Sequence, residues 1–120
     1  MKPTSLFVAV MLLVTTSVFA DAKADARAEI ARQVKLLKKG DVTALKARFT
    51  ARQKERITAK NVNKAQRELS QYTLDDLVDS VSEGEYGGQK TIKIMMKNGR
   101  TLTTLVEENG QWYADTIWFR

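Results

Sequence analysis

The sequence has no histidine and no cysteine, and the chemistry considered for it is that of a carboxylate base with tyrosines beside it. Nucleophilic sites of the Ser-His-Asp or Cys-His kind are excluded, as are metal sites with imidazole or thiolate ligands. A carboxylate acting as general base remains, and the candidate is Asp115, with Tyr113 or Tyr72 beside it. The alternative, which we favour, is that Asp115 is a cross-strand partner of a lysine or threonine.

Asp75, Asp76 and Asp79 lie close together and raise the question of a calcium site. Their spacing lacks the glycine and the terminal glutamate of a calcium-binding loop. Carboxylates are also favoured in the first turn of a helix, where they interact with its dipole. We interpret the cluster as a helix start and predict neither a metal site nor a cofactor.

The aromatic end of the chain, QWYADTIWFR, could belong to a core or to the wall of a cavity. Large aromatic side chains anchor sheets on helices, and they also line sites for apolar ligands. The core interpretation is favoured, with a pocket as the alternative. The candidate pocket residues are Phe49, Tyr72, Trp112 and Trp118. The candidate residues for contact with a protein partner are Leu102, Tyr113, Ile117 and Phe119.

Residues 1–20 have the features of an export signal. A lysine precedes an apolar run at residues 6–14, and Val18 and Ala20 suit the −3 and −1 positions of a cleavage site. A short membrane anchor is the alternative, but the run is too short to span a bilayer comfortably. We predict cleavage after Ala20, a single domain over residues 21–120 without a transmembrane segment, and a periplasmic or secreted location.

Positive charge is concentrated in the first half of that domain. Residues 21–70 contain 14 Lys and Arg against 6 Asp and Glu, a net charge of +8, whereas residues 71–120 contain 5 against 8, a net charge of −3. A basic surface can meet nucleic acid, anionic lipid or an acidic protein, or it can simply be solvated, which we favour. Nucleic acid is not expected, because no base-stacking aromatic residues are interleaved with the basic ones.

These candidates need elements to position them, and the first half of the domain has helical patterns. Apolar residues at spacings of three and four predict a helix over residues 24–39, which Gly40 should end. Asp41 is a good N-cap for a second, short helix. Residues 50–53 fit a capping box, with a threonine at the cap and a glutamine three residues later, and predict a further turn or two.

Thr58 can cap again, and helical spacing runs over residues 60–72. Residues 74–81 also have helical spacing, but they could instead form an edge strand. Residues 83–88, with the sequence EGEYGG, predict a turn or flexible loop.

The remainder predicts an antiparallel meander of three strands. Asn98-Gly99 and Asn109-Gly110 tolerate the positive φ angles of two-residue hairpin turns. The expected strands are residues 91–97, 101–107 and 111–119. With two-residue turns, the expected pairs are Ile92–Leu105, Ile94–Thr103, Met96–Thr101, Leu105–Ala114 and Thr101–Trp118.

This register gives the sheet one face suited to the core and one mixed face that includes Asp115. A longer second turn would exchange the two faces. The expected core face carries Ile92, Ile94, Met96, Leu105, Trp112, Ala114 and Trp118.

Two stretches resemble the nuclear transport factor 2-like family. LLKKGDVTALKARFT is similar to an early segment in which one helix ends at a glycine-aspartate and a second follows. KNGRTLTTLVEENGQWYADTIWF is similar to the closing hairpins, where a glycine before a tryptophan introduces the last strand. The similarity is greatest to short exported bacterial members of unknown function.

The resemblance implies an α+β fold in which N-terminal helices pack on a curved antiparallel sheet of three to four strands, forming a cone with an apolar cavity. It also implies a homodimer, since members often pair through the sheet. A related cone enzyme, ketosteroid isomerase, uses an aspartate base, and here that role would fall to Asp115. Fold alone does not select among the family's functions.

We therefore expect a non-enzymatic binding protein that holds a small apolar molecule in a shallow cone or a protein partner on the open sheet face. The alternatives are an isomerase or dehydratase using Asp115, and a basic protein that binds the envelope surface.

Overall fold

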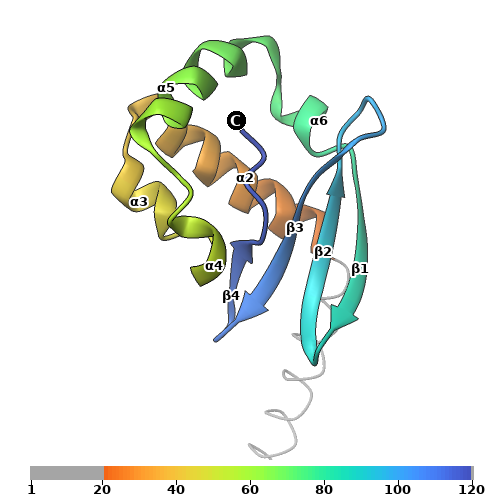
Figure 1. The fold of residues 1–120 in the computed structure, drawn as a ribbon. Coiled ribbons are helices and arrows are strands. Elements are labelled where there is room, and N and C mark those ends of the chain that lie inside the picture. The colour runs from red at the N-terminus through yellow and green to blue at the C-terminus, as the bar shows by residue number, and fades with distance from the viewer. Residues whose placement is uncertain (1–20, 120) are drawn as a thin grey trace, which may run out of the picture.

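The computed structural model describes residues 21–119. The predicted export signal over residues 1–20, including the cleavage after Ala20, lies outside the described residues. Within the described part, helices come first and a four-stranded antiparallel sheet follows, which confirms the α+β class (Figure 1). No helix in this part has the length and apolar character needed to cross a membrane.

The first two helices are those that the sequence predicts. Helix α2 (Ala22–Lys39) ends at Gly40, which has φ = 73° and donates its N–H to the C=O of Leu37 at 3.0 Å. Helix α3 (Val42–Lys46) is capped by Asp41, whose carboxylate accepts a hydrogen bond from the N–H of Ala44 at 3.1 Å. The turn between them is therefore held by local hydrogen bonds.

The next helices differ from expectation in detail. Helix α4 (Ala51–Lys54) lacks the predicted capping box: the hydroxyl of Thr50 accepts no N–H of the helix and is directed to Asp115, donating to its Oδ1 at 2.9 Å. Thr58 does cap α5 (Ala59–Glu68), with Asn61 completing a capping box. Helix α5 ends before residue 72, and the chain continues as the 3-10 helix η1 (Leu69–Gln71).

Residues 74–81, predicted as helix or edge strand, contain parts of both. Helix α6 (Leu74–Leu77) is capped by Thr73, and strand β1 (Ser80–Tyr86) begins shortly after it. The predicted turn or loop over residues 83–88 is therefore too long, because residues 83–86 belong to β1 and only residues 87–88 form the turn. Gly87 and Gly88 have φ angles of 58° and 84°, so these two residues suffice for the turn into β2 (Gln89–Met95).

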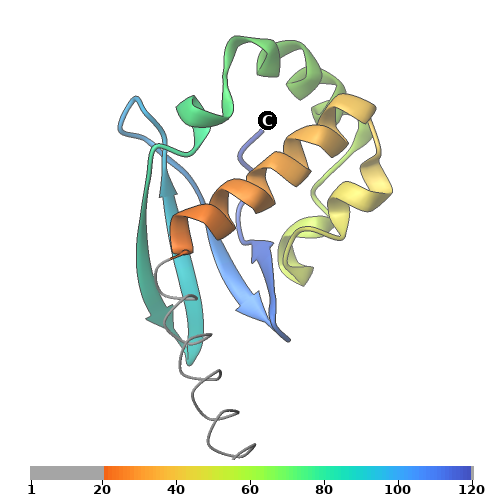
Figure 2. The same cartoon turned by 180° about the vertical axis from the view of Figure 1, so that it is seen from behind.

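Strands β3 (Thr101–Glu108) and β4 (Gln111–Ala114) complete a sheet of order β1-β2-β3-β4 in which every neighbouring pair is antiparallel. Figure 2 shows α2 crossing one side of the sheet, from β1 and β2 toward α3. The chain from α5 to α6 then returns to the sheet over the far end of α2.

The register confirms three predicted pairs and contradicts two. Met95, not Met96, pairs with Thr101, because the β2–β3 turn is longer than two residues and is closed by the N–H of Met96 donating to the C=O of Arg100 at 2.7 Å. Leu102 is left unpaired in a bulge, which restores the register beyond it. The confirmed pairs are Ile92–Leu105, Ile94–Thr103 and Leu105–Ala114.

The last strand stops at Ala114, so the predicted strand over residues 111–119 is too long. The edge of β4 bonds to residues 48–50: the N–H of Ala114 donates to the C=O of Arg48, and the N–H of Thr50 donates to the C=O of Ala114, each at 3.0 Å. The chain then leaves the sheet, so Trp118 does not pair with Thr101. Figure 1 shows this C-terminal segment running between the helices and β3.

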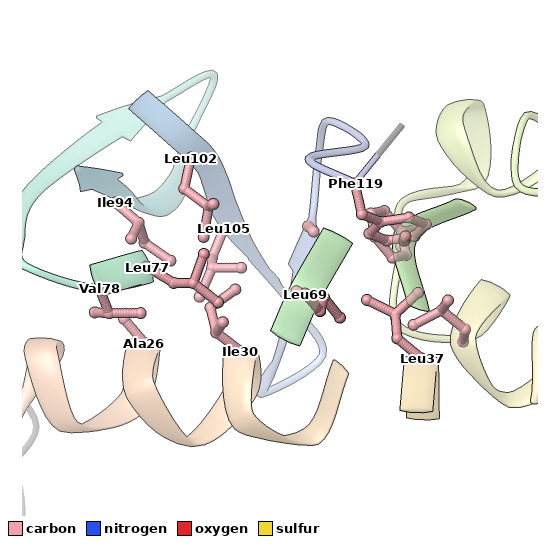
Figure 3. Close-up of a cluster of buried hydrophobic side chains, with 14 of the residues drawn as sticks. Ala26, Ile30, Leu37, Leu69, Leu77, Val78, Ile94, Leu102, Leu105 and Phe119 are labelled. Carbon is pink, nitrogen blue, oxygen red and sulfur yellow. The ribbon is translucent and has the colours of Figure 1, made fainter. Parts of the chain in front are cut away.

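The core lies between α2 and the sheet, and the face predicted to be buried is the face that is buried. Ile92, Ile94, Leu105 and Ala114 are at most 2% exposed, and Met96, Trp112 and Trp118 are half-buried against them. Figure 3 shows Leu102, Leu105 and Ile94 of the sheet directed toward side chains of α2 and α6. The labelled partners are Ala26, Ile30, Leu77 and Val78.

Neighbouring residues of β3 test this arrangement, because Leu105 is fully buried and Val106 is half-buried on the other face. We expect Leu105→Ala to lower the free energy of unfolding by about 3 kcal/mol, since it removes a packed side chain and leaves a cavity. Val106→Ala should cost less than about 1 kcal/mol. Urea unfolding followed by circular dichroism measures both, and equal losses would contradict the register.

Candidate functional site

A buried polar cluster on α2 is the feature that sequence analysis missed. Glu29 and Gln33, one helical turn apart, are 1% and 0% exposed. Nε of Arg48 donates to Oε2 of Glu29 at 2.9 Å, and a second nitrogen of the same guanidinium donates to Oε1. Arg32 adds a hydrogen bond at 3.0 Å, and the side-chain amide of Gln33 donates to Oε2 at 3.0 Å. The carboxylate of Glu29 also raises the pKa of Arg48.

This cluster continues into the C-terminal segment. The indole N–H of Trp118 donates to Oε1 of Gln33 at 2.7 Å. Trp118 meets Phe119 edge to face with ring centroids 5.3 Å apart, and Phe119 meets Phe49 in the same way at 5.7 Å. No buried side-chain nitrogen or oxygen of the described residues lacks a partner. Gln33 thus fixes the Trp118 ring directly, and the rings of Phe119 and Phe49 pack in sequence beside it.

Beside these rings lies a half-open hollow of about 420 Å³. One side is formed by the end of α5, η1 and α6, another by the β2–β3 turn, and the inner wall by the C-terminal aromatic residues. Its volume falls in the range typical of small-molecule sites. The lining residues are Ala65, Glu68, Leu69, Gln71, Tyr72, Leu77, Met96, Asn98, Arg100, Leu102, Trp118 and Phe119.

The structure brings together two of the four predicted pocket residues. Tyr72, which is 44% exposed, and Trp118 line this hollow. Phe49 is buried behind Phe119 and does not line it. Trp112 lines a separate hollow of about 360 Å³ that also includes Ile92.

The predicted protein-contact residues do not form one surface. Leu102 and Phe119 are only 7% and 4% exposed, so their assignment to a contact face is wrong. The bulge at Leu102 turns that side chain inward, and the early end of β4 lets Phe119 fold back into the core (Figure 3). Tyr113 and Ile117 are half-buried.

Asp115 is placed as a structural carboxylate. Arg52 donates to it twice, at 3.0 and 2.6 Å, and the hydroxyl of Thr50 donates at 2.9 Å. The hydrogen bonds from Arg52 hold the pKa of Asp115 below its ordinary value despite partial burial, and Thr50 adds to the effect. The favoured sequence interpretation was a bonding partner of this kind, but the main partner is an arginine of α4 rather than a strand residue.

The catalytic candidates do not converge. Asp115 is not among the residues that line the hollow containing Tyr72. The hydroxyl of Tyr113 points to Gln111, at 3.5 Å, whereas the carboxylate of Asp115 accepts its hydrogen bonds from Thr50 and Arg52. A lowered pKa also makes a carboxylate a weaker base.

Asp75 and Asp76, two of the three aspartates near α6, each have a structural partner. Asp75 and Asp76 lie in its first turn, as the sequence predicts for a helix start. Asp75 pairs with Arg27 at 2.6 Å, and Asp76 accepts the N–H of Thr73 at 2.9 Å. Across residues 21–119, no group of three potential ligands is arranged to hold a metal ion.

Comparisons with known proteins add no relative: no family model matches the chain, and neither the curated proteins nor the solved structures give a match.

The Asp115 contacts predict a pH-dependent contribution to stability. Because the folded-state pKa is lowered, the contribution is complete above the unfolded pKa of about 4 and is lost as pH falls through the folded value. We expect Asp115→Asn to lower the free energy of unfolding by about 1 kcal/mol at pH 7. The difference from wild type should be clearly smaller near pH 2, because protonation below the unfolded pKa of about 4 progressively removes the contribution.

Urea unfolding at both pH values measures this difference. Asp79→Asn is the matched control, because the exposed Asp79 carboxylate has no hydrogen-bond or ion-pair partner among the described residues. A loss for Asp115→Asn that is the same at both pH values would contradict the assignment.

Proposed function

We propose that this chain is an exported, non-enzymatic binding protein of the nuclear transport factor 2-like type. In this proposal it holds a small apolar molecule in the hollow beside Tyr72, Trp118 and Phe119. The observation that carries the proposal is the wall of that hollow. Trp118 is fixed from behind by its hydrogen bond to Gln33, yet it is half-buried and borders open space in front, while the buried Phe119 packs beside it against Phe49.

A wall that is ordered before a ligand arrives favours binding. Immobilising rotamer-rich side chains on association costs free energy, and groups already fixed avoid that cost. Leu69, Leu77 and Leu102 line the same hollow but are at most 7% exposed, so Tyr72, Met96 and Trp118 supply its accessible apolar surface beside polar residues. Apolar walls with a few placed polar groups are the usual composition of small-molecule sites.

The family assignment is supported by the element order. A long helix ends at a glycine-aspartate, short helices follow, and an antiparallel meander closes with a strand that contains Trp112. The packing of α2 against the sheet (Figures 1 and 2) is what the resemblance implies, and the hollow beside Trp118 would correspond to the cavity of its cone.

The alternatives have less support. Catalysis by Asp115 would need a free carboxylate near a cavity, and Asp115 is bonded to Arg52 and Thr50. A protein partner on the sheet could not contact Leu102 and Phe119, because both side chains are buried. Binding of the basic helices to an anionic surface would not use the hollow at all.

The uncharged dye Nile red tests the proposal, because its emission rises in apolar surroundings. We expect saturable binding, with energy transfer from tryptophan that persists in Trp112→Phe, where Trp118 is the remaining tryptophan. Tyr72→Ala removes one side of the hollow and should weaken binding about fivefold, equivalent to about 1 kcal/mol. Titration followed by dye fluorescence measures the affinities.

Tyr86→Ala is the control, because Tyr86 is 82% exposed at the end of β1 and does not line the hollow. Saturable binding that Tyr86→Ala weakens as much as Tyr72→Ala would place the dye elsewhere. The absence of saturable binding would reject the proposed function.

A further inference from the structure

The β2–β3 turn forms a rigid polar side of the hollow. The N–H of Gly99 donates to the C=O of Met96 at 2.9 Å, and the N–H of Arg100 donates to Oδ1 of Asn98 at 2.9 Å. The turn is also tied to α6, because the N–H of Lys97 donates to the C=O of Asp76 at 2.9 Å. Arg100 is therefore presented to the hollow from a fixed backbone.

The guanidinium of Arg100 differs from those that stabilise the fold. Among residues 21–119 it takes part in no hydrogen bond or ion pair. By contrast, four arginines each pair with a carboxylate, namely Arg27, Arg32, Arg48 and Arg52. A planar guanidinium binds a carboxylate through two parallel hydrogen bonds, so Arg100 is suited to an acidic group.

The inner wall of the hollow offers no comparable polar group. The indole N–H of Trp118 is already bonded to Gln33, and Phe119 has no side-chain donor or acceptor. Met96 and Leu102 line the hollow together with these rings. A ligand here would place its apolar body on the aromatic wall and its charged end at the turn.

Glu68 limits the charge of that ligand. It lines the hollow from the end of α5, whereas Arg100 lines it from the β2–β3 turn. A second acidic group on the ligand would approach the exposed Glu68 carboxylate, and like charges repel. One acidic group is therefore favoured over two.

We infer that the hollow binds a monoanionic amphiphile, a carboxylic acid with a medium-length alkyl chain, with the carboxylate on Arg100 and the chain against Trp118 and Tyr72. This inference rests on the proposed function and names the class of ligand.

The test compares decanoate with decanol, which have the same chain length but differ in charge. Isothermal titration calorimetry below the micellar concentration gives the affinities, and Trp118 fluorescence in Trp112→Phe reports where the chain lies. We expect decanoate to bind about tenfold more tightly than decanol, because a charge-assisted bidentate contact is gained. Arg100→Gln should remove this preference, and Arg100→Lys should keep part of it.

Two variants make the result specific. Lys93→Gln removes a positive charge from an exposed site outside the hollow and should leave the preference unchanged. Glu68→Gln should improve the binding of decanedioate, which carries two carboxylates, more than that of decanoate.

The possible failures are distinguishable. Equal binding of decanoate and decanol, with Arg100→Gln without effect, would overturn the inference and leave the proposed function intact. Loss of the preference in Lys93→Gln as well as in Arg100→Gln would indicate general electrostatic attraction and would also overturn it. If neither compound binds while Nile red does, the inference fails and the proposed function stands; if Nile red does not bind either, both fail.

Discussion

Burial of the Glu29 carboxylate is the constraint on which the rest of the structure depends. A charged group that is 1% exposed is tolerated only when its oxygens are surrounded by donors. Arg48 and Arg32 supply the positive charge, and Gln33 supplies the remaining donor. Because the Gln33 amide turns its NH2 group to Glu29, its carbonyl oxygen must face the opposite way, toward Trp118.

The same constraint connects the sheet to the helices. Arg48, which neutralises Glu29, also accepts the N–H of Ala114 with its backbone carbonyl, so the end of β4 is joined to the residue that completes the buried cluster. The chain then leaves the sheet and brings Trp118 to Gln33 and Phe119 to Phe49. These contacts place Trp118 and Phe119 at the inner wall of the hollow.

Stability and binding therefore use different sides of the same residues. The indole N–H of Trp118 is used in the hydrogen bond to Gln33, while another part of its ring borders the hollow. Arg100 is on a turn that is fixed by backbone hydrogen bonds, and its side chain has no such structural task among the described residues. This division separates the residues that hold the hollow from the residue that would select its ligand.

Local signals in the sequence were enough to predict the helix that ends at Gly40, the caps at Asp41 and Thr58, and the pairing of Ile92 with Leu105. Each depends on residues within one turn or one hairpin. β1 was missed as a full strand because the turn after it needed only two glycines.

The site was less predictable, because it depends on long-range contacts. Gln33 and Trp118 are far apart in sequence, and a helical pattern gives no reason to pair them. One signal was available: Glu29 and Gln33 lie on the same stripe of α2 as Ala26, Ile30 and Leu37, so polar residues occupied core positions. The bulge that turns Leu102 inward had no comparable signal.

The most direct test of this account is hydrogen exchange of the two indole N–H groups, followed by nuclear magnetic resonance of 15N-labelled protein, with Trp112→Phe to assign them. The account predicts that the Trp118 indole exchanges far more slowly than that of Trp112, and that Glu29→Gln abolishes this difference while the domain remains folded. Equal exchange rates in the wild-type protein would contradict it. Slow exchange of Trp118 that Glu29→Gln leaves unchanged would show that the buried carboxylate does not position the wall.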